Sequence, residues 1–212
     1  MKSPFNNHAE RIAAFKQSFI YPVISSEFCG GREITDVLCE LAANGAKIVQ
    51  LREKNRSGKE LFELGCKCRE ITTAHNMLLI INDRIDIALA CNADGVHLGQ
   101  DDLPVASARA IAPELIIGVS THNESEIFAA QQDKCSYLNI GPIFPTATKN
   151  VACGALGIKR FCELKNLVDV PFSVMGGIKE RHISQLASLG AQHIAMVTEV
   201  IAKPELCRFL SR

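Results

Sequence analysis

The sequence lacks an excess of either charge and lacks any long hydrophobic run. Lysine plus arginine and aspartate plus glutamate each number 23 among the 212 residues, so the formal net charge is zero. This balance argues against nucleic acid and against a membrane surface as partners, because both select proteins with a basic excess. No apolar stretch approaches the roughly 18 residues of a membrane-spanning helix, and residues 1–17 lack a signal-peptide pattern. We therefore expect a cytoplasmic protein.

The nine cysteines lack the spacing of a metal or redox site. Zinc sites place their cysteine and histidine ligands at short, regular separations, whereas Cys66 and Cys68 stand two residues apart in a helical pattern and face different directions. We expect most of the nine to be buried small apolar residues in a reducing compartment. The sequence also lacks a G-x-G-x-x-G stretch after its first apolar run, which argues against a dinucleotide-binding sheet.

What the sequence does contain is an alternation of short apolar runs and longer amphipathic segments. The runs are apolar on both faces, as expected for parallel strands covered on both sides, and they are Phe19–Ile24, Ala46–Leu51, Met77–Ile81, Gly95–Leu98, Ile116–Val119, Tyr137–Ile140, Phe172–Met175 and His193–Val197. Helices are predicted near Glu33–Asn44, Gly58–His75, Ile85–Cys91, Val105–Ala112, Glu124–Gln132, Gly157–Asn166, Arg181–Leu189 and Glu199–Leu210. Eight such units predict the α/β class and a single (β/α)8 TIM barrel over residues 1–212. Residues 1–17 should form a short extra helix across the barrel bottom, and a doubly wound open sheet is the competing architecture.

The loop after the sixth predicted strand has the composition of an anion-binding site. In Gly141–Lys149 an apolar run ends in prolines, two threonines and a lysine, with no acidic residue nearby. Hydroxyl and backbone N–H groups orient phosphate oxygens, and an ammonium supplies positive charge. Thr146, Thr148 and Lys149 are therefore candidates for binding phosphate. The alternative is an ordinary turn whose threonines bond to their own backbone.

Other predicted strands also end in polar residues. Catalytic groups of a TIM barrel come from the carboxyl ends of the strands, and these ends hold Gln50, Arg52, Lys54, Asn82, Asp83, His97, Asp102, Ser120 and His122. Taken one at a time, the aspartates are typical of helix N-caps, and the histidines are typical of hydrogen-bonded residues in the barrel wall. Together, basic groups and two carboxylates at one barrel mouth suit a polyphosphate bridged by a hard cation, because Mg²⁺ takes one or two carboxylates and borrows oxygens from phosphates.

A second anion site is expected after the seventh and eighth strands. Gly176 and Gly177 follow the seventh strand, and Thr198 follows the eighth. Glycine N–H groups at these strand ends form the phosphate site of many barrels. The sequence thus predicts one site for a diphosphate with a metal ion and one for a monophosphate.

Six stretches resemble the thiamine phosphate synthase family, also called the thiamine-phosphate pyrophosphorylases. They follow the family's order and spacing, and they are Val49–Lys54, Ile81–Arg84, Ala93–Pro104, Gly118–His122, Gly141–Lys149 and Gly176–Ile178. The resemblance implies a TIM-barrel transferase that joins 4-amino-2-methyl-5-hydroxymethylpyrimidine diphosphate to a thiazole monophosphate and releases thiamine phosphate and pyrophosphate. It also implies that pyrophosphate departs first and that the thiazole nitrogen captures the resulting pyrimidine-methyl cation.

The resemblance further implies a role for individual residues. The pyrimidine diphosphate would contact Gln50, Arg52, Lys54, Asn82, Ser120 and Lys149, while Asp83 and Asp102 would hold Mg²⁺. The thiazole phosphate would contact Thr146, Thr148, Gly177, Val197 and Thr198. Lys149, Arg52 and Lys54 would be catalytic, because preorganised positive charge stabilises the charge that grows on the leaving group.

Two other functions are open to a chain of this kind. A thiazole tautomerase on the same barrel would use His122 as acid or base, and it would need neither Lys149 nor the Asp83 and Asp102 pair. A non-catalytic binder of a thiazole or thiamine phosphate would keep the fold without the reaction. The metal and diphosphate groups favour the synthase. The sequence does not specify the oligomeric state, and a homo-oligomer is left open.

Overall fold

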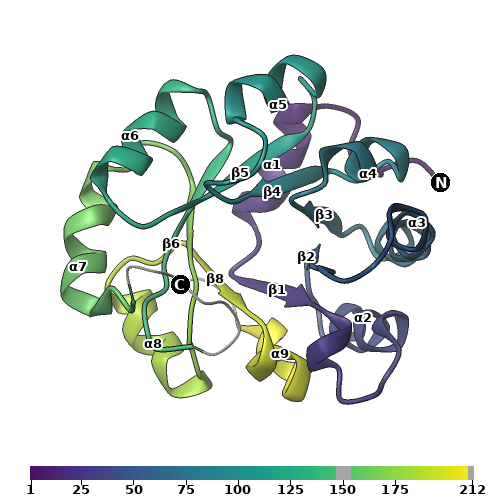
Figure 1. The fold of residues 1–212 in the computed structure, drawn as a ribbon. Coiled ribbons are helices and arrows are strands. Elements are labelled where there is room, and N and C mark those ends of the chain that lie inside the picture. Colours follow the sequence, from purple (N-terminus) through teal and green to yellow (C-terminus); the bar gives the residue numbers. More distant parts are fainter. Residues whose placement is uncertain (147–153, 210–212) are drawn as a thin grey trace.

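The strands of the protein close into a barrel in which each strand is parallel to both neighbours (Figure 1). The structure is a computed structural model that describes residues 1–146 and 154–209. The strands are β1 (Ile20–Ile24), β2 (Ile48–Leu51), β3 (Leu78–Asn82), β4 (Gly95–Leu98), β5 (Ile116–Thr121), β6 (Tyr137–Ile140), β7 (Phe172–Val174) and β8 (His193–Met196). The predicted TIM barrel is confirmed, and the open sheet is excluded because β8 pairs with β1.

Helices cover the outside of the barrel (Figure 1). The α-helices are α1 (His8–Lys16), α2 (Ile34–Ala43), α3 (Gly58–Ala74), α4 (Ile85–Ala90), α5 (Val105–Ile111), α6 (Glu124–Gln132), α7 (Gly157–Leu164), α8 (Glu180–Ser188) and α9 (Thr198–Ala202). Short 3-10 helices are η1 (Ser26–Phe28), η2 (Lys165–Leu167) and η3 (Pro204–Arg208). No helix in the described part of the chain is long and apolar enough to cross a membrane.

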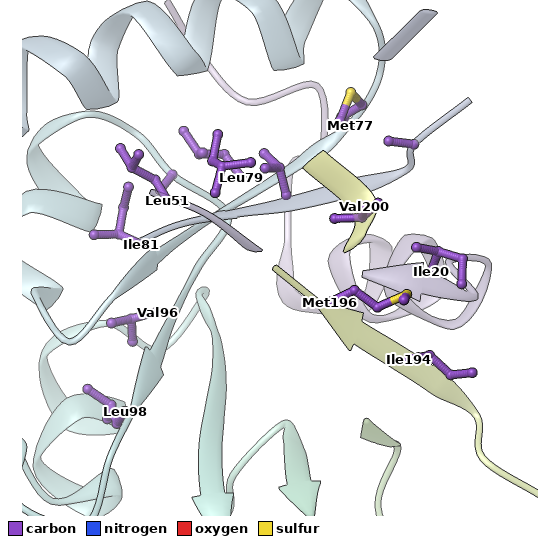
Figure 2. Close-up of a cluster of buried hydrophobic side chains, with 14 of the residues drawn as sticks. Ile20, Leu51, Met77, Leu79, Ile81, Val96, Leu98, Ile194, Met196 and Val200 are labelled. Carbon is purple, nitrogen blue, oxygen red and sulfur yellow. The ribbon is translucent and has the colours of Figure 1, made fainter. Parts of the chain in front are cut away.

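The strands bury both of their faces. Outward side chains such as Leu79 and Ile81 on β3 pack in one large cluster with the helices, and Figure 2 shows part of this cluster. Inward side chains such as Leu78 and Ile80 belong to a separate, smaller cluster inside the barrel. This two-sided burial explains why the strands read as continuous apolar runs in the sequence.

Helix α1 closes the amino-terminal end of the barrel, as predicted. The Asn7 side chain caps the helix by accepting a hydrogen bond from the Glu10 N–H. Near the other end of the helix, Phe15 is fully buried, and its ring centroid lies 4.5 Å from that of Tyr137 and 4.2 Å from that of His193. Phe15 therefore plugs the interior below the first residues of the strands.

The prediction of one final helix over Glu199–Leu210 is wrong. Helix α9 ends at Ala202, and the 3-10 helix η3 begins at Pro204. Proline has no backbone N–H to continue the helix, and its ring disfavours helical dihedrals at the preceding residue. Lys203 accordingly has φ −134° and ψ 74°. Leu210 lies outside the described residues.

Candidate active site

The polar residues of the site occupy inward positions at the carboxyl ends of the strands. Strand β5 runs to Thr121, two residues beyond the predicted end at Val119, so Ser120 lies within the strand and opposite Asn139 of β6. Asn82 of β3 likewise lies opposite His97 of β4. Because inward positions recur every second residue, strands β2, β3, β5 and β6 each place an apolar side chain low in the barrel and a polar one above it.

These polar side chains line one cavity of about 230 Å³. It brings together the predicted site residues Gln50, Arg52, Lys54, Asn82, Asp83, Asp102, Ser120, Thr146, Gly177, Val197 and Thr198, together with His97 and His122. Two further predicted residues, Thr148 and Lys149, lie outside the described residues. The polar residues noted at the predicted strand ends therefore share a single cavity.

Two carboxyl groups meet on one wall of the cavity. The side chains of Asp83 and Asp102 lie close together, and the pKa of Asp102 is raised, first by burial and then by the neighbouring Asp83. Asp102 Oδ2 also accepts a hydrogen bond of 2.6 Å from the Gly99 N–H, and Asp83 forms an ion pair with Lys54. Neither aspartate is an N-cap, because the caps of α4 and α5 are Arg84 and Pro104.

The backbone of Asp83 has the left-handed dihedral φ 61°. Few residues other than glycine adopt this conformation, although aspartate does so more readily than most. Asp83 directly follows β3, and its backbone N–H donates a hydrogen bond of 2.8 Å to the His97 carbonyl. The aspartate is thus fixed by the backbone of the neighbouring strand.

Glycines shape the opposite side of the cavity, after β7. Gly176 and Gly177 have φ 102° and 61°. A Cβ at Gly177 would lie 2.4 Å from the Pro145 carbonyl oxygen, so the position leaves no room for a side chain. The backbone of this turn therefore reaches the cavity directly, next to Val197 and Thr198.

His122 lines the cavity and is bonded to the first turn of α6. Its backbone N–H and its Nδ1 lie 2.8 Å and 2.7 Å from Glu126 Oε2. The carboxylate of Glu126 thereby fixes the orientation of the imidazole at the cavity edge.

Several residues in and below the cavity were not identified from the sequence. Asn139 follows Tyr137 by two positions on β6, so the two-residue period could have placed it inward. Lys179 lines the cavity and pairs with Glu199 at 3.0 Å. Tyr21 and Tyr137, whose hydroxyls lie 2.9 Å apart below the cavity, are separated by 116 positions, and no local pattern pairs them.

Comparison with known proteins adds to this geometry. The family model described as thiamine monophosphate synthase matches residues 20–200. The chain belongs to the thiamine monophosphate synthase family. The match spans all eight strands and the loops that carry the cavity residues.

Individual relatives agree with the family assignment. The thiamine-phosphate synthase of Dictyoglomus thermophilum is 37% identical over 201 residues, covering 94% of this chain and 90% of that protein. The thiamine-phosphate synthase of Clostridium tetani is 40% identical over 188 residues, covering 88% and 90%. A solved structure of the thiamine phosphate pyrophosphorylase from Pyrococcus furiosus superposes with a TM-score of 0.82 at 29% identity, covering 92% of this chain and 96% of that one.

Proposed function

We propose that the protein is a thiamine phosphate synthase, a transferase that joins a pyrimidine-methyl group to the nitrogen of a thiazole phosphate and releases pyrophosphate. The observation that carries the proposal is the family membership of a chain whose cavity pairs two carboxylates with basic groups at one barrel mouth. A proton-transfer isomerase would not need this collection of charge. A cytoplasmic location is supported by the eight free cysteines among the described residues.

The two aspartates are suited to Mg²⁺. Among the residues that the structure describes, no three histidine, cysteine or acidic side chains gather as a metal cluster. A pair of carboxylates is what Mg²⁺ commonly takes from a protein, with waters and substrate phosphates completing its coordination. The contact between Asp83 and Asp102 places two like charges together, and a divalent cation would relieve their repulsion. When bound there, Mg²⁺ would neutralise charge on a diphosphate.

The basic residues would bind and orient the diphosphate. Arg52 continues the β2 ladder, since its N–H donates to the Ile24 carbonyl at 2.9 Å, and its side chain lines the cavity. Lys54 lies on the same side and holds Asp83 in place. Their positive charge, with that of Lys149, would favour departure of pyrophosphate because the leaving group gains charge as the bond breaks.

The glycine turn after β7 would bind the phosphate of the thiazole substrate. In the described part of the chain, no hydrogen bond uses the backbone N–H groups of Gly177 and Ile178, and such groups bind phosphate oxygens well. Thr198 offers a hydroxyl beside them. The two substrates would then meet between the acidic wall and the glycine turn, with Thr146 and Thr148 beside the thiazole.

A product assay tests the proposal. The purified protein is incubated with both substrates and Mg²⁺, and thiamine phosphate is measured by chromatography. The variant Arg52→Ala should lose most of the turnover, whereas Arg56→Ala, whose guanidinium pairs with Glu53 outside this cavity, should retain it. Absence of thiamine phosphate from the wild-type reaction would refute the synthase assignment.

A further inference from the structure

A continuous hydrogen-bond network crosses the barrel interior directly below the cavity. Gln50 Nε2 lies 3.0 Å from the Tyr21 hydroxyl, which lies 2.9 Å from the Tyr137 hydroxyl. The Tyr137 hydroxyl lies 2.9 Å from His97 Nδ1, and His97 Nε2 lies 3.0 Å from Ser120 Oγ. We call these five residues the interior network. Its two ends, on β2 and β5, both line the cavity.

The middle of the interior network is closed to water. Tyr21 and Tyr137 are 1% and 0% exposed. Burial raises the pKa of both hydroxyls well above the ordinary value, so both stay neutral at neutral pH. A neutral hydroxyl has a single proton to donate. Each tyrosine therefore donates to one neighbour and accepts from the other, and the direction of one bond determines the direction of the next.

The side-chain amide of Gln50, at one end of the interior network, determines the direction in which its hydrogen bonds are donated. The Gln50 NH₂ group donates to Tyr21, so Tyr21 donates to Tyr137 and Tyr137 donates to His97 Nδ1. A His97 that accepts at Nδ1 carries its proton on Nε2 when neutral, and it donates that proton to Ser120 Oγ. Ser120 then has its own O–H proton to offer to the cavity.

We propose that Tyr21, Tyr137 and His97 are positioning residues that give Gln50 and Ser120 opposite hydrogen-bonding roles toward the substrate. Gln50 presents its carbonyl oxygen as an acceptor, and Ser120 presents its hydroxyl as a donor. This inference rests on the proposed function. It extends that function by assigning a part in substrate selection to two tyrosines buried beneath the cavity and to His97 in its lining.

The two roles match an aminopyrimidine. Its exocyclic amine donates and its ring nitrogens accept, so it satisfies an acceptor at Gln50 and a donor at Ser120. A 4-oxo analogue presents a carbonyl in place of the amine, and two acceptors would then face each other at Gln50. Rejection of this analogue requires that the Gln50 amide cannot turn over, which is the constraint that its bond to Tyr21 supplies.

Substrate discrimination tests the proposal. The ratio of kcat/KM for the 4-amino pyrimidine diphosphate over its 4-oxo analogue should fall about tenfold or more in Tyr137→Phe and in Tyr21→Phe, the scale of one hydrogen bond. Phe15→Leu serves as the control, because it weakens packing against the same Tyr137 ring without removing a hydroxyl. It should lower thermal stability and leave the ratio unchanged. A wild-type ratio in both tyrosine variants would overturn the proposal.

A second measurement does not depend on catalysis. Nitrogen-15 NMR of the full chain should show neutral His97 protonated at Nε2, and a proton on Nδ1 would reverse the direction of the network and overturn the proposal. If the wild-type protein turns over neither pyrimidine, the proposed function fails, whereas the His97 tautomer still decides the direction of the interior network.

Discussion

At the residue scale, the paired carboxylates of Asp83 and Asp102 are the feature that most distinguishes this cavity from an ordinary polar pocket. Their contact raises the pKa of Asp102 beyond the effect of burial. Two facing carboxylates repel each other when both are ionised, and a cation or a substrate that bound them would relieve this cost. Their cost is therefore an argument for function, in line with the clustering of perturbed groups at active sites.

The first prediction concerns this pair. Asp83→Asn and Asp102→Asn should each reduce turnover by on the order of 10²-fold or more, because each removes half of the proposed metal-binding set. Asp101→Asn is the matched control, since Asp101 also lines the cavity but takes no part in the pair. Steady-state assays at several Mg²⁺ concentrations provide the measurement. Equal loss of activity in all three variants would contradict a specific role for the pair.

The second prediction concerns Lys149, whose role stays a prediction from sequence. Lys149→Ala should lower kcat by on the order of 10²–10³, the loss seen when one preorganised electrostatic donor is removed. Lys149→Arg should not restore it, because a planar guanidinium does not replace a compact ammonium. His122→Ala should lower kcat far less, because the thiazole nitrogen needs no proton transfer. An unchanged kcat with only a raised KM for the pyrimidine diphosphate would show that Lys149 binds substrate without assisting its ionisation.

At the element scale, a buried ion pair joins α3 to the segment between α4 and β4. Arg69 Nη1 donates to Asp94 Oδ2 at 2.6 Å, and both side chains are almost fully buried, at 1% and 0% exposure. The Leu79 N–H donates to the same oxygen at 2.8 Å, and Arg11 of α1 lies 3.4 Å from the other oxygen. Asp94 lies within one of the stretches that resemble the family, yet its partners indicate a structural role.

The third prediction follows from that burial. Asp94→Ala should lower the free energy of unfolding by about 3–5 kcal/mol, because it leaves the buried Arg69 guanidinium without its counter-charge. Asp86→Ala is the matched control, since its pair with Arg84 is exposed and should be worth less than about 1 kcal/mol. Urea unfolding followed by circular dichroism measures both. Similar losses in the two variants would refute the structural role of Asp94.

The elements also show which parts of the fold the sequence could predict. Each strand is a continuous apolar run between polar segments, so all eight were located to within about two residues, as is usual for strong patterns. The prediction of one final helix was wrong because it followed the amphipathic pattern of Glu199–Leu210 and gave too little weight to Pro204. Proline ends helices locally. The pairing of Tyr21 with Tyr137 was not predictable from the sequence, since it depends on which inward side chains lie at the same level along the axis of the closed barrel.

At the scale of the whole molecule, closure of the barrel depends on the junction of β8 with β1. His193, the first residue of β8, makes a buried hydrogen bond through Nδ1 with the Ser18 carbonyl just before β1. Burial lowers the pKa of His193 from 6.5 to about 4, although the bond to Ser18 opposes this shift. A charged imidazole is therefore disfavoured where the last strand meets the first.

The fourth prediction is a loss of stability in mild acid. Because the folded-state pKa lies below the unfolded value of 6.5, the unfolded chain binds the proton more tightly. The free energy of unfolding should therefore fall as the pH drops from above 6.5 toward 4, by about 2 kcal/mol at pH 5 from this residue alone. Urea midpoints of the wild type and of His193→Gln at pH 7.5 and pH 5 measure the effect. A variant that loses as much stability as the wild type over this range would exclude His193 as the cause.

The central claim is that this barrel couples departure of pyrophosphate to formation of thiamine phosphate. The most direct test quantifies both products from one reaction that contains both substrates and Mg²⁺. We predict equal amounts of pyrophosphate and thiamine phosphate, and loss of both products in excess EDTA. Pyrophosphate without thiamine phosphate, or full turnover in excess EDTA, would contradict the account.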